Sequence, residues 1–134
     1  MNNHSIRLSV TLIGIAALIA LTASAYAGDS SKEVATAASH AGYAAKAPDI
    51  KQVHMHLHHV VNCLVGPKGD GFDANEANPC AAMGNGAIPD ANDAAKKAKL
   101  TRVVEMAKKG LASDDMMEAK KQASATEMAL KPAM

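Results

Sequence analysis

The sequence contains very few large aromatic side chains. Among its 134 residues there is no tryptophan, and Tyr26, Tyr43 and Phe72 are the only tyrosine and phenylalanine residues. This scarcity counts against a b-type haem or electron-transfer protein, because a haem pocket needs a large apolar lining. Alanine is left as the dominant apolar residue, and it favours helices but buries little surface. We therefore expect slender, closely packed helices around a thin core.

An excess of charge of one sign is also missing. The chain has 14 lysine and arginine residues against 13 aspartate and glutamate residues. This balance excludes the strongly basic surface that is typical of nucleic-acid-binding proteins. The chain also lacks a glycine-rich phosphate loop, a C-x-x-C-H haem attachment motif and a serine or cysteine nucleophile motif. The sequence therefore predicts a protein that is not an enzyme and does not bind nucleic acid.

A long hydrophobic run occurs only at the N-terminus. Arg7 supplies a positive start, residues 10–23 are mostly apolar, and Ala25-Tyr26-Ala27 is an A-x-A cleavage motif. The apolar run is shorter than the roughly 20 residues that a membrane span needs. We predict a signal peptide over residues 1–27, export to the periplasm, and a mature chain that begins at Gly28 without membrane attachment. An uncleaved N-terminal anchor is the alternative.

Cysteine is scarce as well. Cys63 and Cys80 are the two cysteines, and no C-x-x-C spacing is present. In an exported chain two cysteines usually form a disulfide, and a loop of this size stabilises a fold by about 3 kcal/mol. A thiolate metal site or a redox pair is the alternative, but neither has its usual spacing here. We predict a structural disulfide.

Four helical segments are recognisable in the mature chain. Apolar residues at a period near 3.6 predict helices over 31–47, 50–64, about 90–112 and 116–131. Ser30 and Glu33 have the spacing of a capping box, and Asp49 with Gln52 offers a second cap. In the last helix Met116, Ala119, Ala123 and Leu130 are expected to face inward. Residues 66–89 carry many glycine and proline turn pairs and predict a long loop.

An internal repeat relates the two halves. Residues 34–64 and 100–130 each comprise a helix, a break with an acidic cap and a second helix, and Asp49 aligns with Asp115. One helical hairpin cannot bury its apolar face alone, whereas two stacked hairpins can. The predicted fold is therefore all-α. It is a single domain over residues 28–134, an antiparallel four-helix bundle built from hairpins 31–64 and 90–131 with a disulfide-tied crossover loop over 65–89.

Histidines are concentrated in one run. The segment His54-Met55-His56-Leu57-His58-His59 holds four of the six histidines. His54 and His58 are four residues apart and share one face of a helix. Neutral imidazoles at this spacing can bind one zinc, copper or nickel ion. A solvated polar helix face is the alternative interpretation of the same run.

A folded hairpin brings a third histidine into range. His40 and His54 lie at similar distances from the turn at residues 47–48, so antiparallel helices place them at one level. We therefore predict His40, His54 and His58 as metal ligands. Secondary candidates are His56, His59, Met55 and Met106. Asn62 extends the stripe of His54 and His58 and is predicted to support the ligands or to cap the helix.

The second hairpin lacks histidines at the positions aligned with those of the first. Met106 and Met128 stand at two of these positions, and thioether ligands would suit copper(I). Methionine more often fills gaps in a core. We expect a single site, with copper as the first candidate ion and zinc or nickel as alternatives.

The hairpin sequence ASHAGYAAKA followed by VHMHLHH resembles that of small histidine- and alanine-rich metal-binding proteins of bacterial periplasms. The resemblance covers the helical segments and not the loop, and it implies a four-helix bundle that buffers divalent metals such as copper. In that family histidines occur in all repeats, whereas here they stop at His59. The expected function is thus capture of one divalent late first-row metal ion. The alternative is a non-catalytic envelope protein that uses the Cys63–Cys80 loop as a binding surface.

Overall fold

The computed structural model describes residues 28–133. The predicted signal peptide, residues 1–27, lies outside the described residues. Within the described part the regular secondary structure consists of helices without any strand, which confirms the all-α class. No helix among these residues is both long enough and apolar enough to cross a membrane.

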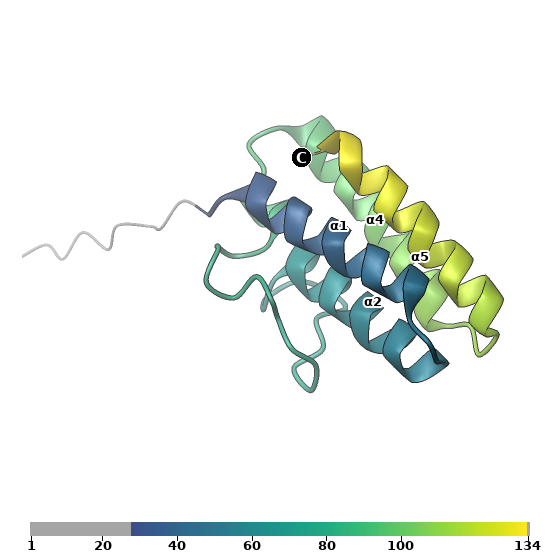
Figure 1. The fold of residues 1–134 in the computed structure, drawn as a ribbon. Coiled ribbons are helices and arrows are strands. Elements are labelled where there is room, and N and C mark those ends of the chain that lie inside the picture. Colours follow the sequence, from purple (N-terminus) through teal and green to yellow (C-terminus); the bar gives the residue numbers. More distant parts are fainter. Residues whose placement is uncertain (1–27, 134) are drawn as a thin grey trace, which may run out of the picture.

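Long helices form most of the described chain. They are α1 (Ser30–Lys46), α2 (Ile50–Val65), α4 (Ala94–Leu111) and α5 (Met116–Leu130), joined by the short helix α3 (Ala87–Asp90) and followed by the 3₁₀ turn η1 (Lys131–Ala133). Helix α1 packs against α2 and α5, and α4 packs against α5 and α2 (Figure 1). Each long helix therefore has two long neighbours with which it shares its apolar face.

An aspartate stands immediately before each long helix as its N-cap. The carboxylates of Asp29, Asp49, Asp93 and Asp115 accept hydrogen bonds from backbone N–H groups of the first turn, which satisfies donors that would otherwise lack partners. The predicted cap at Asp49 is confirmed, whereas the predicted capping box of Ser30 and Glu33 is wrong. Because Asp29 caps α1, these two side chains are free to bond elsewhere. Ser30 Oγ donates to Ala87 O and Glu33 accepts from Gly86 N, so both hold the start of α3.

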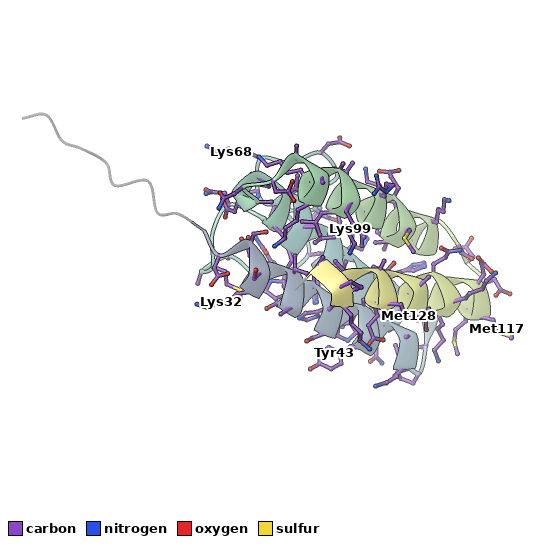
Figure 2. All side chains as sticks on the ribbon, turned by 90° about the horizontal axis from the view of Figure 1, so that it is seen from above. Lys32, Tyr43, Lys68, Lys99, Met117 and Met128 are labelled. Carbon is purple, nitrogen blue, oxygen red and sulfur yellow. A yellow bond between two sulfur atoms is a disulfide. The ribbon has the colours of Figure 1, made fainter. Side chains whose placement is uncertain are left out.

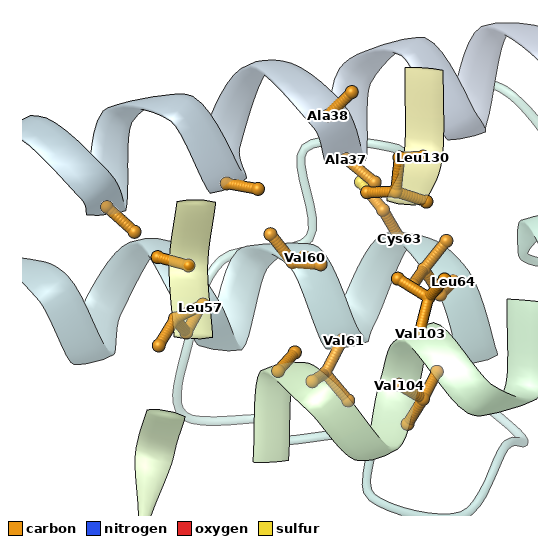
Figure 3. Close-up of a cluster of buried hydrophobic side chains, with 14 of the residues drawn as sticks. Ala37, Ala38, Leu57, Val60, Val61, Cys63, Leu64, Val103, Val104 and Leu130 are labelled. Carbon is orange, nitrogen blue, oxygen red and sulfur yellow. The ribbon is translucent and has the colours of Figure 1, made fainter. Parts of the chain in front are cut away.

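The core is narrow, as the composition indicated. Helix α1 contributes mainly alanines such as Ala37 and Ala38, while α2 supplies larger side chains that include Leu57, Val60 and Leu64 (Figure 3). The close approach of α4 to α2 requires Gly110, because a Cβ there would lie 2.7 Å from Leu57 Cδ1. The expectation that Met116 faces inward is wrong: it is 38% exposed, since it is the first residue of α5 and lies at the edge of the core.

A long, turn-rich connection joins the two halves of the chain. It leaves α2 at Gly66, whose φ of 69° favours glycine. The predicted Cys63–Cys80 disulfide is present, with the two Cα atoms 5.1 Å apart. The predicted loop ended at residue 89, but residues 87–90 form α3. Pro89 is compatible with this helix because the first turn needs no donor from it.

Candidate metal centre

Three imidazoles meet between α1 and α2. His40 lies on α1, and His56 and His59 lie three residues apart on one face of α2. The distance from His40 Nδ1 to His56 Nδ1 is 3.2 Å, and that from His40 Nδ1 to His59 Nδ1 is 3.3 Å. His59 is buried, and the other two are half-buried. We call these three residues the histidine triad.

Two of the three separations between the triad nitrogens match the edge of a coordination tetrahedron. Zinc–nitrogen bonds are about 2.0–2.1 Å long, so two nitrogen ligands on one tetrahedral ion stand about 3.3 Å apart. The Nδ1 separations of His40 from His56 and from His59, 3.2 and 3.3 Å, agree with this value. The triad can therefore supply three ligand atoms to one ion and leaves the fourth position to water or another small ligand.

Burial keeps the triad uncharged. Desolvation, followed by the neighbouring charges of His59 and His56, lowers the pKa of His40 to about 4. Desolvation also lowers the pKa of His56. It is the main cause of the lowered pKa of His59 as well, and there the charge of the Glu76 carboxylate partly offsets the lowering. Only a neutral imidazole has a free lone pair for a metal. The site is thus in its ligating form at neutral pH.

The connecting loop places a carboxylate behind the triad. His59 directs Nδ1 to His40, while its Nε2 lies 3.9 Å from Glu76 Oε2. A carboxylate on the far nitrogen of a ligating histidine fixes the tautomer and the ring orientation. At 3.9 Å the contact is longer than a hydrogen bond, so Glu76 acts on His59 through its charge, which partly offsets the lowering of the His59 pKa.

Asn62 attaches this part of the loop to α2. Its Nδ2 donates to the backbone carbonyls of Asp73, Glu76 and Ala77 at 2.9–3.3 Å, and its Oδ1 accepts from the Asp73 N–H. Asn62 is fully buried. It was predicted to support the ligands or to cap the helix. In the structure it fixes the loop segment that carries Glu76.

Tyr43 lies beside the triad. Its ring centroid is 5.5 Å from those of both His40 and His56, and it contacts His40 edge-on. Tyr43 is 55% exposed and projects from the surface (Figure 2). Its ring covers the outer side of two imidazoles, which contributes to their desolvation.

The structure does not bring His54 and His58 to His40. His54 Nε2 lies 2.9 Å from the backbone oxygen of Ser113, and His58 Nδ1 lies 3.6 Å from Asp73. On α2, His54 and His58 lie along one border of the apolar stripe, and His56 and His59 lie along the opposite border. A helical wheel locates both borders but does not say which border faces the preceding helix. That depends on the handedness with which α2 folds back on α1, so the secondary candidates His56 and His59 meet His40 instead.

The methionines that the sequence suggests as possible ligands are not part of the triad. Met55 is half-buried on α2 next to His56, and Met106 is half-buried on α4. Met128 is 64% exposed on α5 (Figure 2). Two hollows in the described surface are lined by residues of the loop, α3, α4 and the start of α1, and no residue of the triad lines either of them.

Comparison with protein-family models, curated proteins and solved structures finds no match to this chain. His40, His56 and His59 form a group of three imidazoles between two helices that could hold a metal ion, with the loop carboxylate of Glu76 3.9 Å from His59.

Proposed function

We propose that this protein is an exported, non-catalytic binder of one divalent late first-row metal ion, held by His40, His56 and His59. The observation that carries the proposal is the convergence of three neutral imidazoles: His40 Nδ1 lies 3.2 Å from His56 Nδ1 and 3.3 Å from His59 Nδ1, and one ligand atom from each ring lies within 4.8 Å of the others. On this proposal the protein captures or buffers the ion.

The spacing favours zinc. Zinc adopts tetrahedral nitrogen coordination, whereas Cu²⁺ and Ni²⁺ prefer tetragonal or square-planar sites. Copper, the first candidate from the sequence, is retained as the competing ion. Raw affinity follows a general order in which Cu²⁺ exceeds Zn²⁺, so titrations with both ions are needed to separate geometry from intrinsic affinity.

The proposal also covers where the protein resides in the cell and how its helices are arranged. A leader over residues 1–27 would export the protein to the periplasm, where the Cys63–Cys80 disulfide is stable. The helix contacts support an antiparallel four-helix bundle of two hairpins, with α1 and α2 as the metal-binding hairpin.

Calorimetric titration of the mature chain, purified without an affinity tag, tests the function. We expect one zinc ion per chain. The double variant His56→Ala, His59→Ala should lose binding, as should His40→Ala. The matched control is His54→Ala, His58→Ala, which removes the same number of imidazoles from the same helix. Equal loss of binding in both double variants, or undiminished binding in the first, would contradict the assignment.

A second function is supported by a separate observation. The disulfide and Asn62 attach the loop to α2, and loop residues line a hollow with α4. Loops held on rigid scaffolds often bind partners. We propose docking of an envelope protein on the Cys63–Cys80 loop as the alternative. Capture that depends on loop residues Lys68 and Asp70 and is unaffected by chelator would support it against the metal function.

A further inference from the structure

A group of acidic side chains, separate from the histidine triad, lies near the first residues of α1. Glu33 is fully buried, and its Oε1 accepts the Gly86 N–H at 3.0 Å. Its other oxygen, Oε2, is buried without a hydrogen-bond partner among the described residues. A buried polar oxygen without a partner is costly and uncommon in folded proteins. It indicates that a donor belongs at this place.

Gly28 lies against the same group. A Cβ on Gly28 would overlap Asp90 Oδ2 and would lie 2.8 Å from Gly84 Cα. A Cβ on Gly84 would in turn lie 2.6 Å from Gly28 Cα and 3.0 Å from Glu33 Oε1. The Cα of Gly28 and the carboxyl groups of Asp90 and Glu33 therefore surround Gly84. We call Glu33 and Asp90 the carboxylate pair.

We propose that the carboxylate pair is a binding site for the α-ammonium group that removal of the leader creates at Gly28. The inference rests on the proposed cleavage after Ala27 and is independent of the metal centre. The α-nitrogen is one bond of about 1.5 Å from Cα, so it lies in the immediate neighbourhood of Asp90. An ammonium offers three donors and a positive charge, which complements a carboxylate already held by neighbouring bonds.

The hydrogen bonds and charges around the carboxylate pair suit a bound cation. Asp90 accepts the Asn85 N–H and the Asn85 Nδ2–H, so its carboxylate is fixed in position. The side chains of Lys32 and Lys96 bond to Asp29 and Ser31 and not to the carboxylate pair. Burial, with a smaller contribution from the charges of Asp90 and Asp29, raises the pKa of Glu33 to about 7. An ammonium close by would favour its ionised form.

The position of the amine is also matched to the proposed cleavage site. Asp29 is the N-cap of α1, so cleavage after Ala27 leaves one residue before the helix. The overlap of any Cβ with Asp90 makes glycine the residue that fits at this point. Retention of even one further residue would move the charge away and leave a neutral amide at Gly28.

Two chains that differ by one residue test the inference. One begins at Gly28 and the other at Ala27, and both are purified with the disulfide intact. We expect the amine of the Gly28 chain to titrate about one pH unit above the ordinary α-amino range of about 7.7–8.0, measured by NMR. We also expect its thermal midpoint at pH 7 to exceed that of the Ala27 chain by about 5 °C.

Variants show whether the difference in thermal midpoint arises from the carboxylate pair or from any change at the N-terminus. Asp90→Asn and Glu33→Gln should each reduce the difference in midpoint between the two chains. Asp29→Asn is the control: asparagine caps a helix as well as aspartate does, so the difference should persist. Equal midpoints with an amine of ordinary pKa would overturn the inference, as would a difference that Asp90→Asn leaves unchanged.

The intact mass of the chain recovered from periplasmic extracts tests the cleavage itself. A terminus at Gly28 supports the inference, and a mature chain that retains earlier residues overturns it. Neither result bears on metal binding, because the triad lies further along α1 and on α2.

Discussion

Asn62 and Asp73 are joined by hydrogen bonds in both directions. The amide of Asn62 donates to the backbone oxygen of Asp73, its carbonyl oxygen accepts the Asp73 N–H, and both bonds measure 2.9 Å. A residue in the last turns of α2 thus forms with the loop the kind of pairing that a strand forms with its neighbour. Through it the position of the loop carboxylates is tied to the helix that carries two of the triad histidines.

The first prediction concerns this attachment. Asn62→Ala should lower the free energy of unfolding by about 2–4 kcal/mol, because it removes several bonds and leaves buried backbone groups without partners. Urea denaturation monitored by circular dichroism measures the change. Asn75→Ala is the matched control, since Asn75 is exposed and bonds locally to Asp73. A similar loss in both variants would show that Asn62 has no special role.

The second prediction concerns the carboxylate behind the triad. Glu76→Gln should weaken zinc binding about tenfold, the lower end of the effect expected for partners of ligating histidines. Asp73→Asn is the control, because Asp73 faces His58, which lies outside the triad. Competition with a chromophoric chelator measures both affinities. Unchanged affinity in Glu76→Gln would remove Glu76 from the proposed site.

The third prediction concerns acid. The pKa of His40 is about 4 in the fold, below its ordinary value of 6.5. Since the unfolded chain binds the proton more readily, stability is full above about pH 6.5 and falls as the pH drops from there towards 4. His40→Gln should reduce this dependence. Urea midpoints between pH 4 and 8, measured with chelator present, test the slope, and a profile unchanged by the substitution would contradict it.

The metal should add to this dependence, because protons compete with it for the same nitrogens. The low pKa of His40 weakens that competition. Zinc binding should therefore persist to a lower pH than binding by freely exposed histidines. The His54→Ala, His58→Ala variant should give the same pH profile as the natural chain.

The fourth prediction concerns the disulfide. Cys63→Ser with Cys80→Ser should lower the free energy of unfolding by about 3 kcal/mol, as expected for a closed loop of this size. It should also weaken zinc binding, because the loop that carries Glu76 loses one of its attachments. Denaturation and metal titration of the same sample measure the two effects. Full metal affinity in the serine variant would show that the disulfide is not needed to position Glu76.

The fifth prediction concerns helix contact. Gly110→Ala should destabilise the fold by about 1–3 kcal/mol, the usual cost of added bulk in a packed core. The added carbon would lie 2.7 Å from Leu57 Cδ1. Gly42→Ala is the comparison: its nearest neighbour is the Glu127 carboxylate at 3.2 Å, the end of a flexible side chain. Thermal unfolding should show a much smaller change for Gly42→Ala.

The sequence was sufficient for the class of the fold because local signals determine helices. The period of the apolar residues and the aspartate before each helix act within a few positions, and they locate α2, α4 and α5 to within a few residues. Helix α3 was missed because it is a single turn inside a glycine-rich loop. Its start is held by Ser30 and Glu33, which are more than fifty residues away.

The candidate site could be predicted only in part. The sequence identifies the histidine run and His40, but it favours His54 and His58 as ligands over His56 and His59. Both pairs are compatible with one helix face, and the choice between them depends on how two helices pack. The role of Glu76 had no sequence signal, because it reaches the triad through a loop that Asn62 and the disulfide fold back on α2.

The triad takes one side chain from α1 and two from α2, so an ion bound there would act as a cross-link between the helices. A ligand that binds only the folded state raises its stability with the logarithm of the free ligand concentration. The lifetime of the protein against proteases would then follow the supply of the ion. Under metal starvation the chain would be degraded sooner, and its abundance would become a record of how much metal its compartment contains.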